Sequence, residues 1–66
     1  MYKIETEQEI DGRWIAAVKE IPGVMCYGES QAEAMRKVQV LTLRVLADRI
    51  EHQEASPEIA RLFSIN

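Results

Sequence analysis

Few side chains in this 66-residue sequence have the types and spacing that catalysis or metal binding requires. Cys26 is the only cysteine and His52 the only histidine, so no disulfide forms within the chain and no compact zinc-ligand spacing is present. The scattered glycines form no phosphate-binding loop. We therefore expect no catalytic residue, no metal and no cofactor. We interpret Cys26 as a small buried hydrophobe and His52 as a partner of a helix dipole.

A cluster of acidic residues near the N-terminus is the first candidate binding feature. The chain has eleven acidic and eight basic residues, and the net charge of −3 arises within positions 1–29. Glu5, Glu7 and Glu9 alternate with other residues, so they share one face of a strand. Such a face can be solvated, can attract a cation, or can complement a basic protein partner. Without clustered Lys and Arg, we do not expect direct binding of nucleic acid.

The length predicts a single domain over residues 1–66. A chain of about 60 residues buries only about 60% of the surface that its unfolded form exposes, so it usually needs additional support. With disulfides and metals excluded, self-association is the expected support. The sequence contains no apolar run that could span a bilayer and no signal-peptide pattern. Together with a free cysteine, this predicts a cytoplasmic protein without membrane contact.

Three strands are predicted in the N-terminal half. Residues 2–10 alternate between apolar and charged side chains, and the apolar face of this strand should hold Tyr2, Ile4, Thr6 and Ile10. Asp11-Gly12 favours a type I′ hairpin turn. The second strand, over residues 13–19, should lie inside the sheet, with one face formed by Trp14, Ala16 and Val18. A short third strand is expected over residues 24–28, after Pro22-Gly23.

One long helix is predicted over residues 31–53. Ser30 and Glu33 have capping-box spacing, in which each side chain accepts a hydrogen bond from the backbone of the other residue. One apolar stripe of the helix comprises Ala34, Val38, Leu41 and Val45. A second apolar arc comprises Met35, Val40, Leu43, Leu46, Ala47 and Ile50. A small sheet covers only one of the two groups, so the arc either lies deep in the core or forms a self-association face. We favour self-association, through Val40, Leu43, Ala47 and Ile50.

The C-terminal segment leaves two interpretations open. Residues 59–65 alternate weakly, which predicts a fourth strand with Phe63 and Ile65 on one side. A helical turn over residues 58–62 is the alternative. The predicted fold is α+β, in the order β-β-β-α-β, with a three- to four-stranded antiparallel-type sheet and one long helix packed on it.

Three short segments follow one another in a distinctive order: residues 11–18 (DGRWIAAV), 21–24 (IPGV) and 27–34 (YGESQAEA). Together they resemble the HicB family of antitoxins in its small single-domain form, over roughly residues 1–54. The resemblance implies a fold like a truncated ribonuclease H domain without its catalytic carboxylates. It also implies a non-catalytic function, in which the domain binds and neutralises a small basic mRNA-cleaving toxin of a type II toxin-antitoxin system. We do not expect direct DNA binding, because the sequence ends at Asn66 without the DNA-binding domain that many family members carry.

The sequence therefore supports a leading hypothesis and two alternatives. In the leading hypothesis, a self-associating antitoxin-like domain binds a basic toxin ribonuclease through a surface that includes Glu5, Glu7 and Glu9. The first alternative is a homo-oligomeric protein-binding module that has no toxin partner. The second is an enzyme with residual nuclease activity, which is disfavoured because the residues offer surfaces and no reaction centre.

Overall fold

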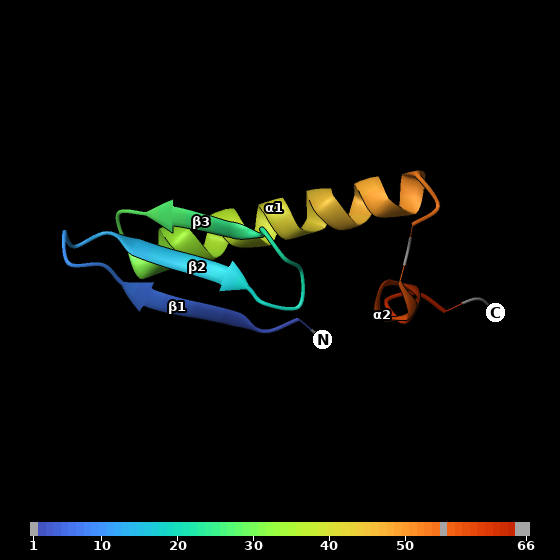
Figure 1. Cartoon of the computed structure of the whole chain (residues 1–66), viewed down its shortest axis with the longest axis horizontal. Coiled ribbons are helices and arrows are strands. Elements are labelled where there is room, and N and C mark those ends of the chain that lie inside the picture. Colours follow the sequence, from blue (N-terminus) through green and yellow to red (C-terminus); the bar gives the residue numbers. More distant parts are fainter. Residues whose placement is uncertain (1, 55, 65–66) are drawn as a thin grey trace.

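A computed structural model describes residues 2–54 and 56–64 of the chain. Three strands come first: β1 (Ile4–Gln8), β2 (Trp14–Val18) and β3 (Met25–Gly28). They are followed by a long helix, α1 (Gln31–Glu51), and a short one, α2 (Pro57–Ala60). The strands form an antiparallel sheet in the order β1-β2-β3, and α1 covers one side of it (Figure 1). The predicted class, α+β with three strands before one long helix, is confirmed.

The central strand β2 determines which face of the sheet enters the core. Its side chains alternate between the two faces of the sheet. Ala16 and Val18 are buried and Trp14 is half-buried, so these three residues share one face, as predicted, and this face packs on α1. Ile15 and Ala17 lie on the opposite face, which no other helix or strand among the described residues covers.

The hairpin between β1 and β2 is longer than the predicted two-residue turn. The Gly12 amide donates to the Glu9 carbonyl at 3.0 Å, and Gly12 has a φ of 92°. A type I′ turn also needs positive φ at the preceding residue, and Asp11 does not have it. The turn type was therefore wrong, although the position of the hairpin was right. The longer loop also carries Ile10 out of the strand, so this residue is fully exposed instead of facing the core.

The cap of α1 is close to the predicted one but differs in one hydrogen bond. The Ser30 hydroxyl accepts from the Glu33 amide at 3.1 Å, as expected for an N-cap. The Glu33 carboxylate accepts from the Glu29 amide at 2.9 Å, one residue before the position that a capping box would use. Both side chains still satisfy backbone amides at the start of the helix.

The turn from β3 into α1 brings strand and helix into close contact. Gly28 is buried, and a Cβ atom added there would lie 2.5 Å from the Ala34 nitrogen. No real Cβ tolerates that distance from backbone, so only glycine fits at the end of β3. The close approach packs the first turns of α1 against the sheet.

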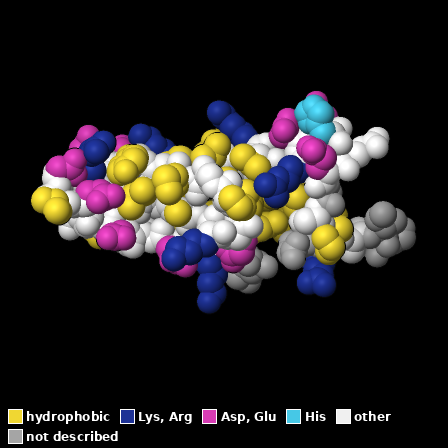
Figure 2. Space-filling view, in the orientation of Figure 1, with side chains coloured by type: hydrophobic (Ala, Val, Ile, Leu, Met, Phe, Trp, Pro, Cys, Tyr) yellow, Lys and Arg dark blue, Asp and Glu magenta, His cyan; other side chains and the backbone are white. Residues whose placement is uncertain are grey.

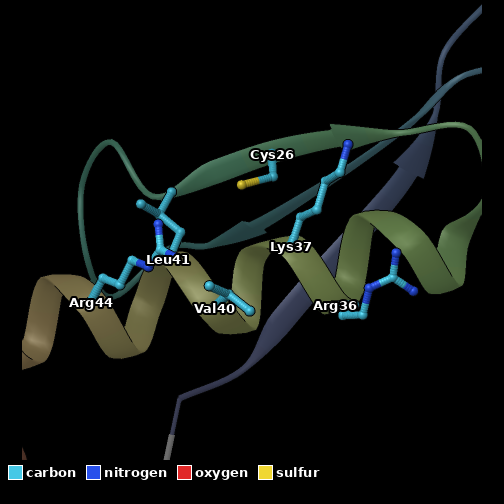
Figure 3. Close-up of a pocket in the computed structure, with 6 residues that line it drawn as sticks. All are labelled: Cys26, Arg36, Lys37, Val40, Leu41 and Arg44. Atoms are coloured by element: carbon cyan, nitrogen blue, oxygen red, sulfur yellow. The ribbon is translucent and has the colours of Figure 1, made fainter.

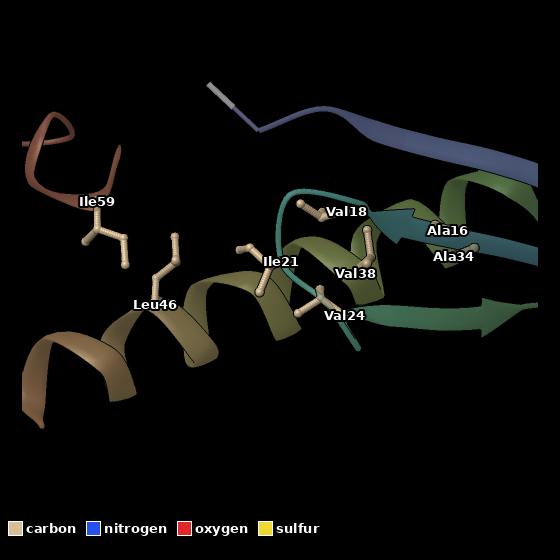
Figure 4. Close-up of a cluster of buried hydrophobic side chains, with 8 residues drawn as sticks. All are labelled: Ala16, Val18, Ile21, Val24, Ala34, Val38, Leu46 and Ile59. Carbon is tan, nitrogen blue, oxygen red and sulfur yellow. The ribbon is translucent and has the colours of Figure 1, made fainter. Parts of the chain in front are cut away.

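The core is small and extends along α1 beyond the sheet (Figure 4). Its buried apolar residues are Ala16, Val18, Ile21, Val24, Ala34, Val38, Leu46 and Ile59. Near the sheet, Val38 lies among the side chains of β2 and the loop that follows it (Figure 4). Further along the helix, Leu46 and Ile59 face each other and join α2 to α1. Leu46 therefore belongs to the core and not to the exposed arc.

The predicted fourth strand is wrong for the residues that the structure describes. Pro57–Ala60 form the short helix α2, and a turn follows at Arg61 and Leu62. The Ser56 hydroxyl accepts from the Ile59 amide at 3.4 Å, and Pro57 occupies the start of the helix, where its missing amide has no cost. These local signals favour a helical turn, which was the alternative interpretation. Phe63 is exposed, and Ile65 lies outside the described residues.

Candidate protein-binding surfaces

The face of the sheet that points away from α1 is the first candidate surface. On this open face, Glu7 pairs across the sheet with Ile15, and Ile15 pairs with Tyr27. Also on this face, Glu5 pairs with Ala17, and Ala17 pairs with Met25. Along β1, Glu5 and Glu7 thus form an acidic row, and along β3, Met25 and Tyr27 form an apolar strip. Met25 and Tyr27 are 52% and 44% exposed, which is high for large apolar side chains in a strand. Figure 2 shows hydrophobic side chains gathered over the strands, with acidic side chains around them.

The three predicted acidic residues lie in two different settings. Glu5 and Glu7 are exposed on the open face, and Lys19 contacts Glu5 at 3.1 Å. Glu9 is half-buried beyond the end of β1. It lines a shallow hollow of about 400 Å³ at the hairpin, together with Ile10, Asp11, Arg13 and Tyr27. Glu5 and Glu7 therefore lie within β1, whereas Glu9 lies just past its end, where its amide donates to the Arg13 carbonyl at 2.7 Å and its side chain lies near Arg13 and Tyr27.

Arg13 links the hairpin to the open face. Its Nε lies 2.9 Å from a carboxylate oxygen of Asp11, and its guanidinium is stacked over the Tyr27 ring. The Arg13 backbone amide and then its side chain lower the pKa of Asp11, and the Asp11 carboxylate raises the pKa of Arg13. Tyr27 was not predicted as a binding residue from the sequence. Its alternation with Cys26 on the third strand was the available signal.

The outer face of α1 is the second candidate surface, and it holds the four residues predicted for self-association. Val40, Leu43 and Ile50 are 45%, 66% and 44% exposed, and Ala47 is exposed as well. Spacings of three, four and three residues place all four on one side of the helix. Each was predicted to lie outside the core, and the structure places each there. Met35 and Leu46, which were assigned to the same arc, are half-buried and buried.

An apolar groove runs between α1 and β1, beside the outer face of α1. It has a volume of about 420 Å³ and is lined by Tyr2, Ile4, Val18, Gln39, Thr42, Leu43 and Leu62. Thr42 is buried, and its hydroxyl donates to the Val38 carbonyl at 2.6 Å. This hydrogen bond within the helix satisfies the buried hydroxyl. Leu43 belongs to both the groove and the outer face. The contribution of Leu62 could not be predicted, because it depends on how α2 folds back.

Cys26 faces a basic hollow on the other side of α1 (Figure 3). The hollow has a volume of about 360 Å³ and is lined by Cys26, Arg36, Lys37, Val40, Leu41 and Arg44. Cys26 is half-buried and packs against the core, so its predicted role as a small core hydrophobe holds in part. Lys37 is also 3.5 Å from Glu33 in an i,i+4 ion pair. This hollow was not predicted from the sequence.

The described residues bring together no group of three or more His, Cys, Asp or Glu side chains that could hold a metal ion. His52 caps the end of α1, where its Nδ1 lies 2.9 Å from the Asp48 carbonyl, as its assignment to the helix terminus predicted. Within residues 2–54 and 56–64, no helix is long and apolar enough to cross a membrane. Comparisons with family models, curated proteins and solved structures found no match to this chain.

Proposed function

We propose that this chain is a non-catalytic, HicB-like antitoxin domain that acts in the cytoplasm. It binds and neutralises a small basic mRNA-cleaving toxin of a type II toxin-antitoxin system through the open face of its sheet. The observation that carries the proposal is the pairing, on this face, of an acidic row with an exposed apolar strip. The sequence resemblance supplies the class of the partner.

The two parts of the open face have different roles in this proposal. Glu5 and Glu7 attract a basic partner and compete with RNA phosphates for its Lys and Arg side chains. Tyr27 and Met25 supply apolar surface, which becomes buried when the partner binds. A toxin held in this way has its basic RNA-binding surface covered. The antitoxin itself needs no reaction centre for this inhibition.

The proposal is tested by comparing two charge reversals that change the net charge equally. Glu7→Lys alters the open face, and Asp48→Lys alters the exposed side of α1. The ligand is the basic ribonuclease that co-purifies with the tagged chain. We expect Glu7→Lys to weaken binding at least tenfold and to reduce its salt dependence, and Asp48→Lys to leave both nearly unchanged. Equal effects of the two substitutions would contradict binding through the open face.

A second candidate function is a homo-oligomeric protein-binding module without a toxin. The exposed apolar side of α1 favours this candidate, because it offers a surface for self-association that needs no toxin. Failure to recover any RNA-cleaving partner, with self-association intact, would support this candidate over the antitoxin.

A further inference from the structure

We propose that α1 pairs with α1 of a second copy in antiparallel orientation, through the outer face formed by Val40, Leu43, Ala47 and Ile50. The pair has a two-fold axis that passes between Leu43 and Ala47. This assembly is independent of the partner that the open face of the sheet binds, because the two surfaces lie on opposite sides of the domain.

The spacing of the outer face is that of a helix-pairing seam. Apolar residues separated by alternating steps of three and four occupy the a and d positions of a heptad, which interlock between paired helices. In α1 the buried positions Ala34, Val38, Thr42 and Leu46 face the sheet and α2. The outer face is turned away from them, so a second helix can approach it without displacing the sheet.

The size of the chain's surface indicates that part of it is covered by another molecule. The chain exposes 5259 Å², whereas a compact monomer of 7.6 kDa exposes about 4,300 Å². Its radius of gyration is 13.5 Å, compared with about 11 Å for a compact chain of this length. The excess surface is about as large as the roughly 800 Å² that each partner buries in a stable interface. The extension of α1 beyond the sheet contributes to this excess (Figure 1).

The charges at the two ends of the outer face determine the orientation. Arg36 lies one turn before Val40, whereas Glu51 follows Ile50 at the end of α1. Within the described part of the chain, these two charged residues form no ion pair. In the antiparallel pair, Arg36 of each copy lies near Glu51 of the other. A parallel pair would place like charges side by side, which is unfavourable.

The same two-fold arrangement matches the apolar residues. Val40 of one copy lies opposite Ile50 of the other, and Leu43 lies opposite Ala47. The larger Leu43 side chain therefore lies against the smaller Ala47, and Val40 and Ile50 lie against each other as two side chains of intermediate size. Leu43 also lines the apolar groove beside β1, so its burial in the pair extends the contact toward Leu62.

The first test measures association by analytical ultracentrifugation of the full chain at micromolar concentrations. We expect a dimer, and we expect Leu43→Glu to weaken it at least tenfold. Ile10→Glu is the matched control, because it places the same charge at an exposed apolar residue of the hairpin. A monomeric wild-type chain, or equal effects of Leu43→Glu and Ile10→Glu, would overturn the proposal. Circular dichroism establishes that each variant remains folded.

The second test measures orientation with spin labels on Ala32→Cys in a Cys26→Ser background. Since a helix rises about 1.5 Å per residue, the two labels are separated by roughly 40 Å along the axis of an antiparallel pair. In a parallel pair they lie side by side, roughly 10 Å apart plus the length of the labels. A long distance between the labels is the expected result, and a short one would overturn the antiparallel assignment. Neither test depends on toxin binding. Failure of the pairing proposal can therefore be distinguished from failure of the proposed antitoxin function.

Discussion

The guanidinium of Arg13 lies 4.7 Å from the centre of the Tyr27 ring, which connects the hairpin to the open face of the sheet. Asp11 holds Arg13 from the other side through a contact of 2.9 Å. The Tyr27 ring therefore makes a cation–π interaction with Arg13 while it remains 44% exposed. A large, supported aromatic residue on an uncovered sheet is the kind of residue that anchors protein partners.

The Tyr27→Ala substitution tests whether this residue is the anchor. We expect it to weaken binding of the co-purified ribonuclease by at least about 2 kcal/mol, which is the usual threshold for an interface hot spot. The stability of the free domain should change little, because the ring is exposed. Calorimetric titration measures the first effect and thermal unfolding the second. Unchanged affinity would remove Tyr27 from the interface.

The contact between Gly28 and Ala34 predicts a steric cost. In Gly28→Ala, the new Cβ meets the Ala34 backbone at 2.5 Å, so strand or helix must move. We expect the free energy of unfolding in urea to fall by about 1–3 kcal/mol, which is typical of overpacking. Gly12→Ala is the comparison: it meets no atom within 4 Å, but its φ of 92° adds backbone strain. Gly12→Ala should lower the free energy of unfolding by about 1 kcal/mol. A Gly28→Ala variant as stable as the wild type would contradict the close packing of β3 on α1.

Glu33 predicts a dependence of stability on pH. The hydrogen bond that the Glu33 carboxylate accepts from the Glu29 amide, and then the charge of neighbouring Lys37, hold the pKa of Glu33 below its usual value of 4.5. A carboxylate with a lowered folded-state pKa stabilises the fold above its unfolded-state pKa, and this contribution is lost as the pH falls through the folded-state value. Glu33→Gln should therefore be less stable than the wild type near neutral pH, and the difference should shrink on acidification below about pH 4.5.

Urea unfolding of the two proteins across this pH range measures the effect. The control is Glu51→Gln, which removes a charge near the other end of the same helix without removing a capping bond. A difference between wild type and Glu33→Gln that stays constant with pH would show that the carboxylate does not stabilise the cap through its charge.

The contact between Leu46 and Ile59 predicts that α2 contributes to stability. Ile59 is only 1% exposed, so Ile59→Ala should lower the free energy of unfolding by about 2–4 kcal/mol. Leu62→Ala removes a side chain that is 51% exposed and should have a clearly smaller effect. Hydrogen exchange should also show faster opening at the C-terminal end of α1 in Ile59→Ala. Equal stabilities of the two variants would contradict the packing of α2 on α1.

Local patterns predicted most of the fold. The alternation around Ala16 and the cap at Ser30 were sufficient to place β2 and the start of α1. The errors occurred where several conformations satisfy the same residues. Asp11-Gly12 fits more than one hairpin loop, and the segment after Pro57 alternates weakly while its cap favours a helix.

The candidate surfaces were predicted less completely than the fold. The exposed side of α1 could be found from sequence, because an excess of apolar residues on a helix is visible in its spacing. Leu46 could not be separated from that arc, because its burial depends on Ile59 and thus on α2. Tyr27 and Leu62 were missed for a similar reason. Tyr27 contacts Arg13, and Leu62 lines the same groove as Leu43. In each pair the two residues are distant in sequence and are brought together only by the fold.

The most direct test of the proposed function is an affinity purification of the tagged chain from its own host, followed by an RNA-cleavage assay. Intact-mass measurement identifies the proteins that co-elute, and each is assayed for RNA cleavage with and without this chain. We predict a small basic protein whose RNA cleavage is suppressed by the wild-type chain and is suppressed less by Tyr27→Ala. Recovery of the chain with only copies of itself, or of a partner whose cleavage it does not inhibit, would contradict the antitoxin function.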